Sequence, residues 1–192
     1  MSNPRIGVIV ASTRTTRFAD HVLPWLGAYL DGRDDLDVTV IDLRDHPLPF
    51  YDLPASPGMA PRDYSSDEQR GLGELFDSLD GYIVITNEYN HGYSASLKNT
   101  IDHFSFEFHR KPVAFVGYGN VGGSRAIEQL RQVFAELEMV SVRHAVHLLG
   151  PSIRAIMQGA DAGSALTEYE PRLTQVVDDL LWWANALRAA RA

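Results

Sequence analysis

Three short segments carry the side chains of this sequence that are best suited to bind a ligand. The first, residues 11–18, combines hydroxyl groups with Arg14 and Arg17. The second, residues 86–94, places amides, aromatic rings and a glycine in one stretch, and the third, residues 117–123, is rich in glycine. Each segment follows an apolar run, so together they indicate recognition of a planar, hydrogen-bonding and anionic ligand.

Residues 12–17 are the candidate anion site. Backbone N–H groups at the start of a helix, hydroxyls and guanidinium groups all suit a phosphate. Arg14 and Arg17 favour that interpretation, because cations in a first helical turn oppose the helix dipole and are best tolerated beside an anion. The alternative is local, since serine and threonine cap helices without any ligand.

Residues 86–94 are the candidate edge for a planar ring. Asn87 and Asn90 can hydrogen-bond an amide-like ring edge, and Tyr89 can present its ring or its hydroxyl. Gly92 permits a close backbone approach or a positive φ. A polar turn that caps the next helix explains any one of these residues, but the ordered combination favours a ligand-binding loop.

Residues 117–122 spell G-x-G-x-x-G, which taken literally predicts a dinucleotide site. Its position argues against that prediction, because the fingerprint belongs in a first strand–helix unit and this copy lies in the fourth. The acid that binds the ribose is also missing from the end of the next strand, at residues 148–150. We therefore interpret the motif as a glycine-rich loop of another kind.

Strand and helix patterns alternate along the chain, as in a parallel α/β fold. We predict strands over 6–11, 36–43, 82–86, 113–117 and 140–149. We predict helices over 18–30, 67–79, 97–108, 124–137 and 173–187. Residues 44–66 hold half of the ten prolines and read as a loop, and residues 150–166 have no clear pattern. Ligands of such sheets gather at the carboxyl ends of the strands, so the three polar loops should meet there.

Length and composition limit the class of protein. A chain of 192 residues fits one domain, here residues 1–192. The net charge of −8 argues against nucleic acid or an anionic membrane as partner. The absence of cysteine excludes disulfides and thiolate chemistry, and the seven histidines lack metal-ligand spacing, so we expect no metal. With no signal-peptide core and no apolar run near the ~20 residues of a membrane span, we expect a cytoplasmic protein.

Two triplets and the first loop carry a resemblance to a known family. The triplets are Glu88-Tyr89-Asn90 and Leu97-Lys98-Asn99. In order and spacing they resemble the E-Y-N and L-K-N signature of the NADPH-dependent FMN reductases. The first loop is similar to the phosphate loop G-S-x-R of that family, in a variant form that reads S-T-R-x-x-R. The chain departs from the family pattern at Ala11, where glycine is usual, and at Asn87, where proline is usual.

The resemblance, which covers about residues 5–148, implies a fold, a cofactor and a reaction. The fold is a flavodoxin-like three-layer sandwich with a five-stranded parallel sheet in the order 2-1-3-4-5. The cofactor is FMN, with NADPH or NADH as co-substrate. Hydride passes to flavin N5, and a quinone, azo compound, metal oxyanion or free flavin then takes the electrons in a ping-pong cycle. The flavin carries the chemistry, so no side chain is assigned as catalytic, and the family implies a homodimer or a dimer of dimers.

The same resemblance, with the loops above, implies which residues bind the cofactor. They are Ser12, Arg14, Arg17, Phe18, Asn87, Glu88, Tyr89, Asn90, Gly117, Tyr118 and Gly119. Glu88 has an alternative place against a helix N–H or a neighbouring subunit. A different class of function also stays open: a flavodoxin-type electron carrier that binds FMN and serves protein partners. A cofactor-free binding module is the third hypothesis.

Overall fold

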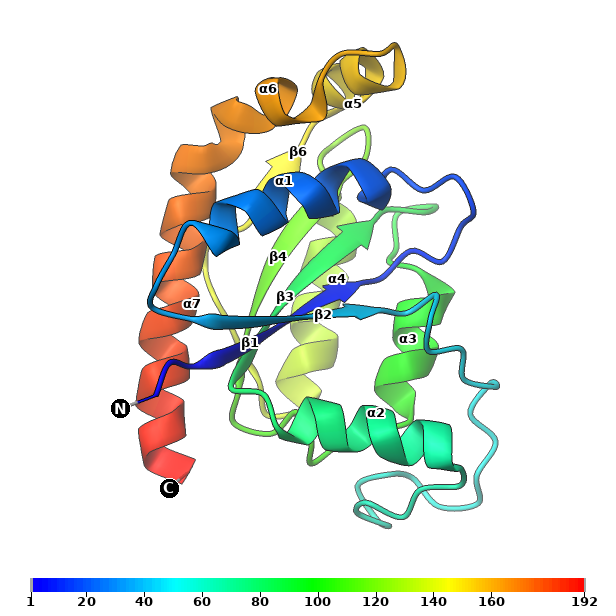
Figure 1. Cartoon of the computed structure of the whole chain (residues 1–192). Coiled ribbons are helices and arrows are strands. Elements are labelled where there is room, and N and C mark those ends of the chain that lie inside the picture. Colours follow the sequence, from blue (N-terminus) through cyan, green and yellow to red (C-terminus); the bar gives the residue numbers. More distant parts are fainter. Residues whose placement is uncertain (1, 192) are drawn as a thin grey trace.

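Six parallel strands form the central sheet of the computed structural model, which describes residues 2–191 (Figure 1). The strands are β1 (Arg5–Val10), β2 (Asp37–Asp42), β3 (Gly81–Asn87), β4 (Pro112–Tyr118), β5 (Val140–Ser141) and β6 (Val146–Leu148). The helices are α1 (Ala19–Asp31), α2 (Asp67–Asp77), α3 (Ala95–Asp102), α4 (Ser124–Glu136), α5 (Gly150–Met157), α6 (Ala162–Leu166) and α7 (Glu170–Arg191), with a 3-10 turn at Thr167–Tyr169.

The strand order β2-β1-β3-β4-β5 confirms the predicted flavodoxin-like topology. Strands β1, β3 and β4 are buried on both faces, which is why they read as continuous apolar runs, whereas the edge strand β2 exposes Val38 and Val40. In β1, Ile6 and Val8 pack with α1 and α7, whereas Ile9 packs with the helices of the other face, α2, α3 and α4. This arrangement sends the polar ends of β1, β3 and β4 to one edge of the sheet.

The predicted fifth strand is wrong as one continuous element. The structure has two short strands instead, β5 and β6, and both pair with β4. Arg131 on α4 supplies the physical reason, because its guanidinium donates to the backbone carbonyls of Val142 at 2.6 Å and Arg143 at 3.0 Å. Those carbonyls are held toward the helix and leave the sheet ladder between residues 142 and 145.

Helix α3 is shorter than predicted and ends at Asp102. Phe104 and Phe108 follow the helix in turns, yet both are buried in the core. The carboxylate of Glu107 accepts a hydrogen bond from the backbone N–H of Ser105 at 2.9 Å, a local contact that competes with further helix. The apolar spacing therefore correctly predicted that Phe104 and Phe108 are buried, but it overestimated the length of the helix.

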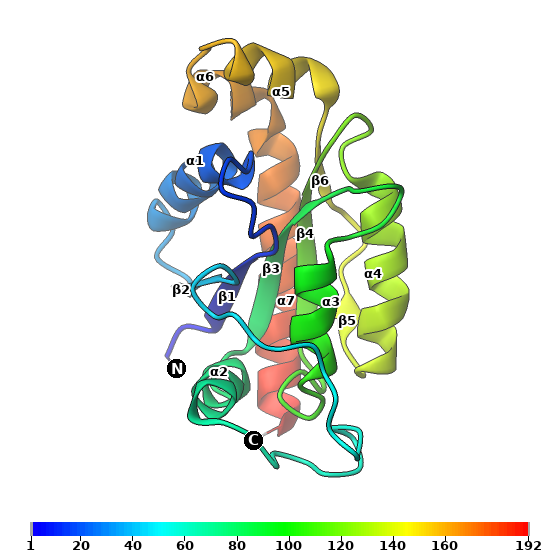
Figure 2. The same ribbon diagram turned by 90° about the vertical axis from the view of Figure 1, so that its right-hand side faces the viewer.

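The segment that showed no clear pattern, residues 150–166, folds into α5 and α6. Figure 2 shows both helices over the edge of the sheet where β3, β4 and β6 end, beside the start of α1. Leu166 is fully buried in the cluster that contains the apolar face of α1. The segment is thus a folded cover on the edge where the polar loops emerge. Within residues 2–191, no helix combines the length and hydrophobicity that crossing a lipid bilayer requires.

Candidate functional site

One open cavity of about 370 Å³ lies at the carboxyl ends of β1, β3 and β4. Its walls are the loops after these three strands and one face of α5. The residues expected at the cofactor all line it except Asn90 and Gly117. The topology therefore brings the three predicted loops together at one place.

The loop after β1 has the features of an anion cradle. No backbone N–H of residues 12–18 donates a hydrogen bond to any described residue. Seven consecutive residues without a backbone acceptor for their N–H groups are unusual in a folded loop, since such donors are normally satisfied. Arg14 also has no carboxylate or carbonyl acceptor within residues 2–191, and its guanidinium carbon lies 6.0 Å from the ring centroid of Tyr89. This loop can therefore donate several hydrogen bonds to a phosphate.

Arg17 has a different environment from Arg14. Its buried guanidinium donates to Asp20 at 2.7 Å, to the carbonyl of Ser12 at 2.7 Å and to both carboxylate oxygens of Asp42. Burial would raise the pKa of Asp42, but the Arg17 guanidinium, together with the backbone N–H and the charge of Arg44, holds that pKa below its usual range. These contacts account for the cation without an external anion. We therefore revise its expected role: Arg17 ties the loop to the end of β2.

Two buried polar side chains at the cavity have no hydrogen-bond partner in the described chain. Asn87 is 2% exposed, and neither its Nδ2 nor its Oδ1 is satisfied. The hydroxyl of Tyr118 faces Ser12 without hydrogen-bond geometry, and burial raises the pKa of Tyr118 to about 12. Buried polar atoms are nearly always hydrogen-bonded, so these groups indicate a ligand that supplies the missing partners.

Glu88 joins the second loop to the third. Its side chain is buried and accepts hydrogen bonds from the backbone N–H of Arg125 at 3.1 Å and from Nε of Arg125 at 2.6 Å. A carboxylate at the start of α4 is favoured by the helix dipole. Of the two places expected for Glu88, the structure contains the contact with a helix N–H. The residue also lines the cavity.

Asn90 lies in a tight turn between Tyr89 and Gly92, which exchange two backbone hydrogen bonds of 2.8 and 2.9 Å. Asn90 and His91 both have positive φ, at 50° and 71°, whereas Gly92 does not. Asparagine adopts this left-handed conformation more readily than most residues. The asparagine of the E-Y-N triplet thus has a conformational explanation, and it does not line the cavity.

The glycines of the third loop serve packing and backbone conformation. A Cβ on Gly117 would lie 2.6 Å from the carbonyl oxygen of Gly122, so the turn can close only over a glycine. Gly119 has a φ of 153°, which favours glycine. The backbone N–H groups of Gly119 and Asn120 donate to no acceptor in residues 2–191. The loop therefore offers free donors at the cavity, beside Glu88.

The structure adds lining residues that the sequence interpretation missed, mainly Ile153, Arg154 and Met157 on α5. The signal was present in the Gly150-Pro151 pair, since proline is favoured in the first turn of a helix. Asn120 was also missed as a lining residue, although it lies inside the G-x-G-x-x-G stretch.

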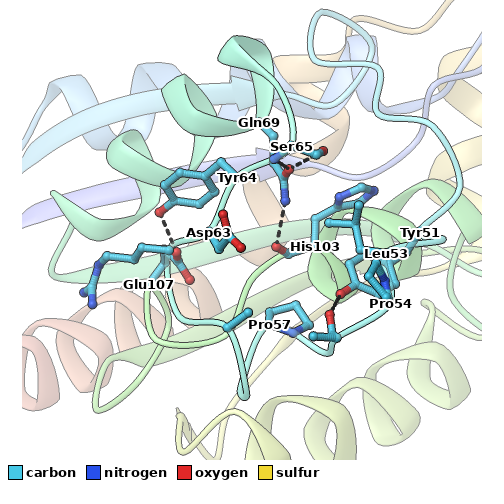
Figure 3. Close-up of a pocket in the computed structure, with 13 residues that line it drawn as sticks. Tyr51, Leu53, Pro54, Pro57, Asp63, Tyr64, Ser65, Gln69, His103 and Glu107 are labelled. Carbon is cyan, nitrogen blue, oxygen red and sulfur yellow. Dashed lines mark hydrogen bonds between the residues drawn. The ribbon is translucent and has the colours of Figure 1, made fainter.

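The proline-rich loop encloses a second, smaller cavity of about 130 Å³ (Figure 3). Several of its polar groups bond internally: Tyr64 donates to Glu107 at 2.6 Å and Gln69 donates to the carbonyl of His103 at 3.2 Å, whereas the buried Nδ1 of His103 has no partner within residues 2–191. Residues 44–66 read as a loop from the sequence, and their first part lines a separate pocket together with Thr13. They contribute no residue to the cavity at the strand ends.

The L-K-N triplet has internal structural roles. Lys98 pairs with Asp102 one turn later, with its Nζ 2.5 Å from Oδ2. The side-chain amide of Asn99 donates to the carbonyls of Leu48 at 3.1 Å and Pro49 at 2.9 Å. Asn99 therefore tethers the start of the proline-rich loop to α3.

Comparisons with known proteins agree with this geometry. The profile of the family described as NADPH-dependent FMN reductase matches residues 4–150. An NAD(P)H-dependent FMN reductase of Schizosaccharomyces pombe, C4B3.06c, is 35% identical over 136 residues, which are 71% of this chain and 68% of that protein. The NAD(P)H-dependent FMN reductase LOT6 of Saccharomyces cerevisiae is 30% identical over 145 residues, 70% of this chain and 75% of that protein.

A solved structure shares the fold. The flavoenzyme FerB of Paracoccus denitrificans, an NAD(P)H:(acceptor) oxidoreductase, superposes with a TM-score of 0.71 at 21% identity. The match covers 95% of this chain and 98% of that chain. Helices α6 and α7, and all but the first residue of α5, lie beyond the part of the chain that the family profile covers.

Proposed function

Because this chain belongs to the NADPH-dependent FMN reductase family and is an NAD(P)H-dependent oxidoreductase that uses FMN, we propose that the strand-end cavity holds the FMN. We further propose that electrons pass through it from NAD(P)H to a small-molecule acceptor. The acceptor classes that we propose are quinones, azo compounds, metal oxyanions and free flavin.

One observation supports this location most strongly. The buried amide of Asn87 has no partner for either polar atom, and it shares a cavity with the free N–H groups of residues 12–18. A ligand that satisfies both needs an amide-like edge and an anionic group, joined in one molecule. FMN has a pyrimidine ring edge and a phosphate, so the residues present fit the cofactor.

The assignments that follow are proposals for individual residues. Ser12, Arg14 and the backbone of the first loop bind the phosphate. Asn87 hydrogen-bonds the ring edge, and Phe18 and Tyr118, whose ring centroids are 5.4 Å apart, form an aromatic wall. Tyr89 stands beside Ser12, with 3.3 Å between their hydroxyl oxygens, and closes the cavity on the β3 side.

When bound, FMN supplies the hydride-accepting and electron-donating chemistry, and the protein supplies position and electrostatics. The free N–H groups of Gly119 and Asn120 are pre-oriented donors that stabilise negative charge developing beside them. Tyr118 stays a neutral hydroxyl near pH 7, since its pKa is raised to about 12. These residues bind, orient and tune, and none is needed as an acid or a base.

We propose that NAD(P)H and the acceptor use this cavity in turn. The supporting observation is that one cavity lies between the three polar loops, and both substrates must reach the same bound ring. Such alternation produces ping-pong kinetics. The test is steady-state oxidation of NADPH and NADH by the FMN-loaded protein with a quinone and an azo dye as acceptors. Parallel double-reciprocal lines support the proposal, and FMN binding without turnover by any acceptor would instead indicate an electron carrier.

We also propose that the chain acts as a homodimer or a dimer of dimers. Phe50 and Met59 on the proline-rich loop are each 82% exposed, and such large exposed apolar side chains often mark a protein contact. Light scattering coupled to size-exclusion chromatography tests this, and a monomer at all concentrations would contradict it.

A further inference from the structure

We propose that Arg154 on α5 binds a phosphate group of the nicotinamide dinucleotide and so helps to determine how the coenzyme is recognised. This inference rests on the proposed function, because it assumes that NAD(P)H enters the strand-end cavity. It concerns a helix that lies almost wholly outside the match to the family profile, which ends at residue 150.

The charge balance of the cavity is the first step of the argument. Arg17 and Glu88 line it but are neutralised by the ion pairs described above. Arg14 and Arg154 remain, and neither has a carboxylate partner among residues 2–191. Although the chain as a whole has a net charge of −8, two guanidinium groups without a carboxylate partner line this one cavity. They indicate that the cavity receives more than one anionic group.

The two guanidinium groups belong to different walls. Arg14 lies on the β3 side, over the ring of Tyr89. Arg154 folds back over the start of its own helix, where a Cβ added to Gly150 would lie only 2.9 Å from its Nη1 and 3.6 Å from the backbone of Asn120. The absence of a side chain at Gly150 therefore creates the space that the guanidinium occupies, next to the loop after β4.

The number of phosphate groups on each ligand distinguishes the role of Arg14 from that of Arg154. FMN carries one phosphate, and Arg14 with the free N–H groups of the first loop provides a complete cradle for it. NADH brings a pyrophosphate, and NADPH brings a pyrophosphate and a further phosphate on the ribose. The second unpaired guanidinium is thus matched by the phosphates of the second ligand, and the planar fork of arginine suits phosphate oxygens.

The rest of the α5 face fits the same ligand. Gly150, Ile153, Arg154 and Met157 are spaced so that they share one face of the helix, and all four line the cavity. Met157 is 63% exposed, which leaves an apolar, adaptable side chain beside the cation. A flat nucleotide ring with a phosphate attached can contact both, so this face is suited to the nucleotide part of the coenzyme.

The test compares Arg154→Gln with Arg154→Lys and with a matched control, Arg172→Gln, which removes an exposed arginine of α7 that bonds only Gln175. Binding of NADP⁺ and of NAD⁺ to the FMN-loaded proteins is measured by calorimetry, and FMN binding to the apoproteins by fluorescence. We expect Arg154→Gln to weaken NADP⁺ binding about tenfold and to leave FMN binding within about twofold. The lysine variant should retain part of the affinity, and the control should match the wild type.

The two coenzymes distinguish the phosphate that is bound. Weaker binding of NADP⁺ alone assigns Arg154 to the ribose phosphate, and equal weakening of both assigns it to the pyrophosphate. The KM values for NADPH and NADH should change in the same way as the affinities for NADP⁺ and NAD⁺. Unchanged binding and unchanged KM for both coenzymes would overturn the inference, as would a loss confined to FMN. Failure of the proposed function is a separate result, because the wild type itself would then neither bind FMN nor oxidise NAD(P)H.

Discussion

Arg14 and Arg17 lie three positions apart in the sequence but have different roles in the structure. Arg14 has no acceptor in the described chain, whereas Arg17 makes four hydrogen bonds to Asp20, Asp42 and a carbonyl. A sequence pattern cannot separate them, because both are cations at the start of the same helix. The difference arises from the parallel pairing of β1 with β2, which brings Asp42 next to the loop.

We expect Arg14→Ala to weaken FMN binding strongly and to leave folding stability nearly unchanged. Charge-assisted hydrogen bonds of the kind proposed contribute about 1.5–3 kcal/mol, which corresponds to a loss of about tenfold or more in affinity. Fluorescence titration of the apoprotein with FMN measures the affinity. Unaltered FMN affinity would place the phosphate elsewhere.

Arg17→Met should give the opposite profile and is the matched partner of that experiment. Removing one side of a buried ion pair leaves Asp42 without its cation, at a cost of about 2–4 kcal/mol where part of the pair is solvated. Thermal or urea unfolding of the apoprotein measures this cost. A fully stable Arg17→Met protein that cannot bind FMN would restore the original assignment of Arg17 to the phosphate.

Lys111 predicts a pH dependence of stability. Burial lowers the pKa of Lys111 to about 8, although its Nζ donates to the carbonyls of Phe76 at 2.8 Å and Asp77 at 2.9 Å. Between about pH 8 and the unfolded value near 10.5, the unfolded chain binds more protons than the folded one, so this residue makes stability increase with pH. The free energy of unfolding of wild type minus that of Lys111→Met should rise by about 1 kcal/mol or more from pH 8 to 10. A flat difference would show that the pKa is not lowered.

At the scale of elements, the turn between Tyr89 and Gly92 predicts which substitutions the second loop accepts. Asn90 has a φ of 50° and does not line the cavity, so its conformation is what the turn requires. Asn90→Gly should keep both stability and FMN affinity, whereas Asn90→Val should lose about 1–2 kcal/mol of stability. Urea unfolding and FMN titration of both variants check this. A large loss of FMN affinity in the glycine variant would show that the side chain binds the cofactor.

The elements also show how far sequence reasoning reaches. Apolar runs and helical spacing predicted β1 to β4, because strands with buried apolar side chains leave a strong pattern, and the strand order followed from the family resemblance. The interruption between β5 and β6 depends on Arg131, a helix residue that binds carbonyls 11 and 12 positions later in the chain. Residues 150–166 gave no pattern that we could interpret, because α5 is short and only Gly150 and Ile156 are buried on it. Contacts that depend on tertiary structure were therefore the ones missed.

At the scale of the whole molecule, the sheet collects three loops that are far apart in the sequence, and α5 and α6 cover the same edge (Figure 2). The chain has a net charge of −8, and two arginines without a carboxylate partner line this cavity. On this basis we propose that the cofactor binds at this edge of the sheet. The cavity under the proline-rich loop lies elsewhere and is bordered by internal hydrogen bonds from Tyr64 to Glu107 and from Gln69 to His103.

The most direct test of the central claim is anaerobic addition of NADPH to the FMN-loaded protein while the long-wavelength absorbance of the flavin is followed. We predict that the protein retains FMN through gel filtration, that NADPH bleaches this band, and that a quinone added afterwards restores it. A protein that retains no FMN, or whose bound FMN is not bleached by NADPH or NADH, would contradict the account.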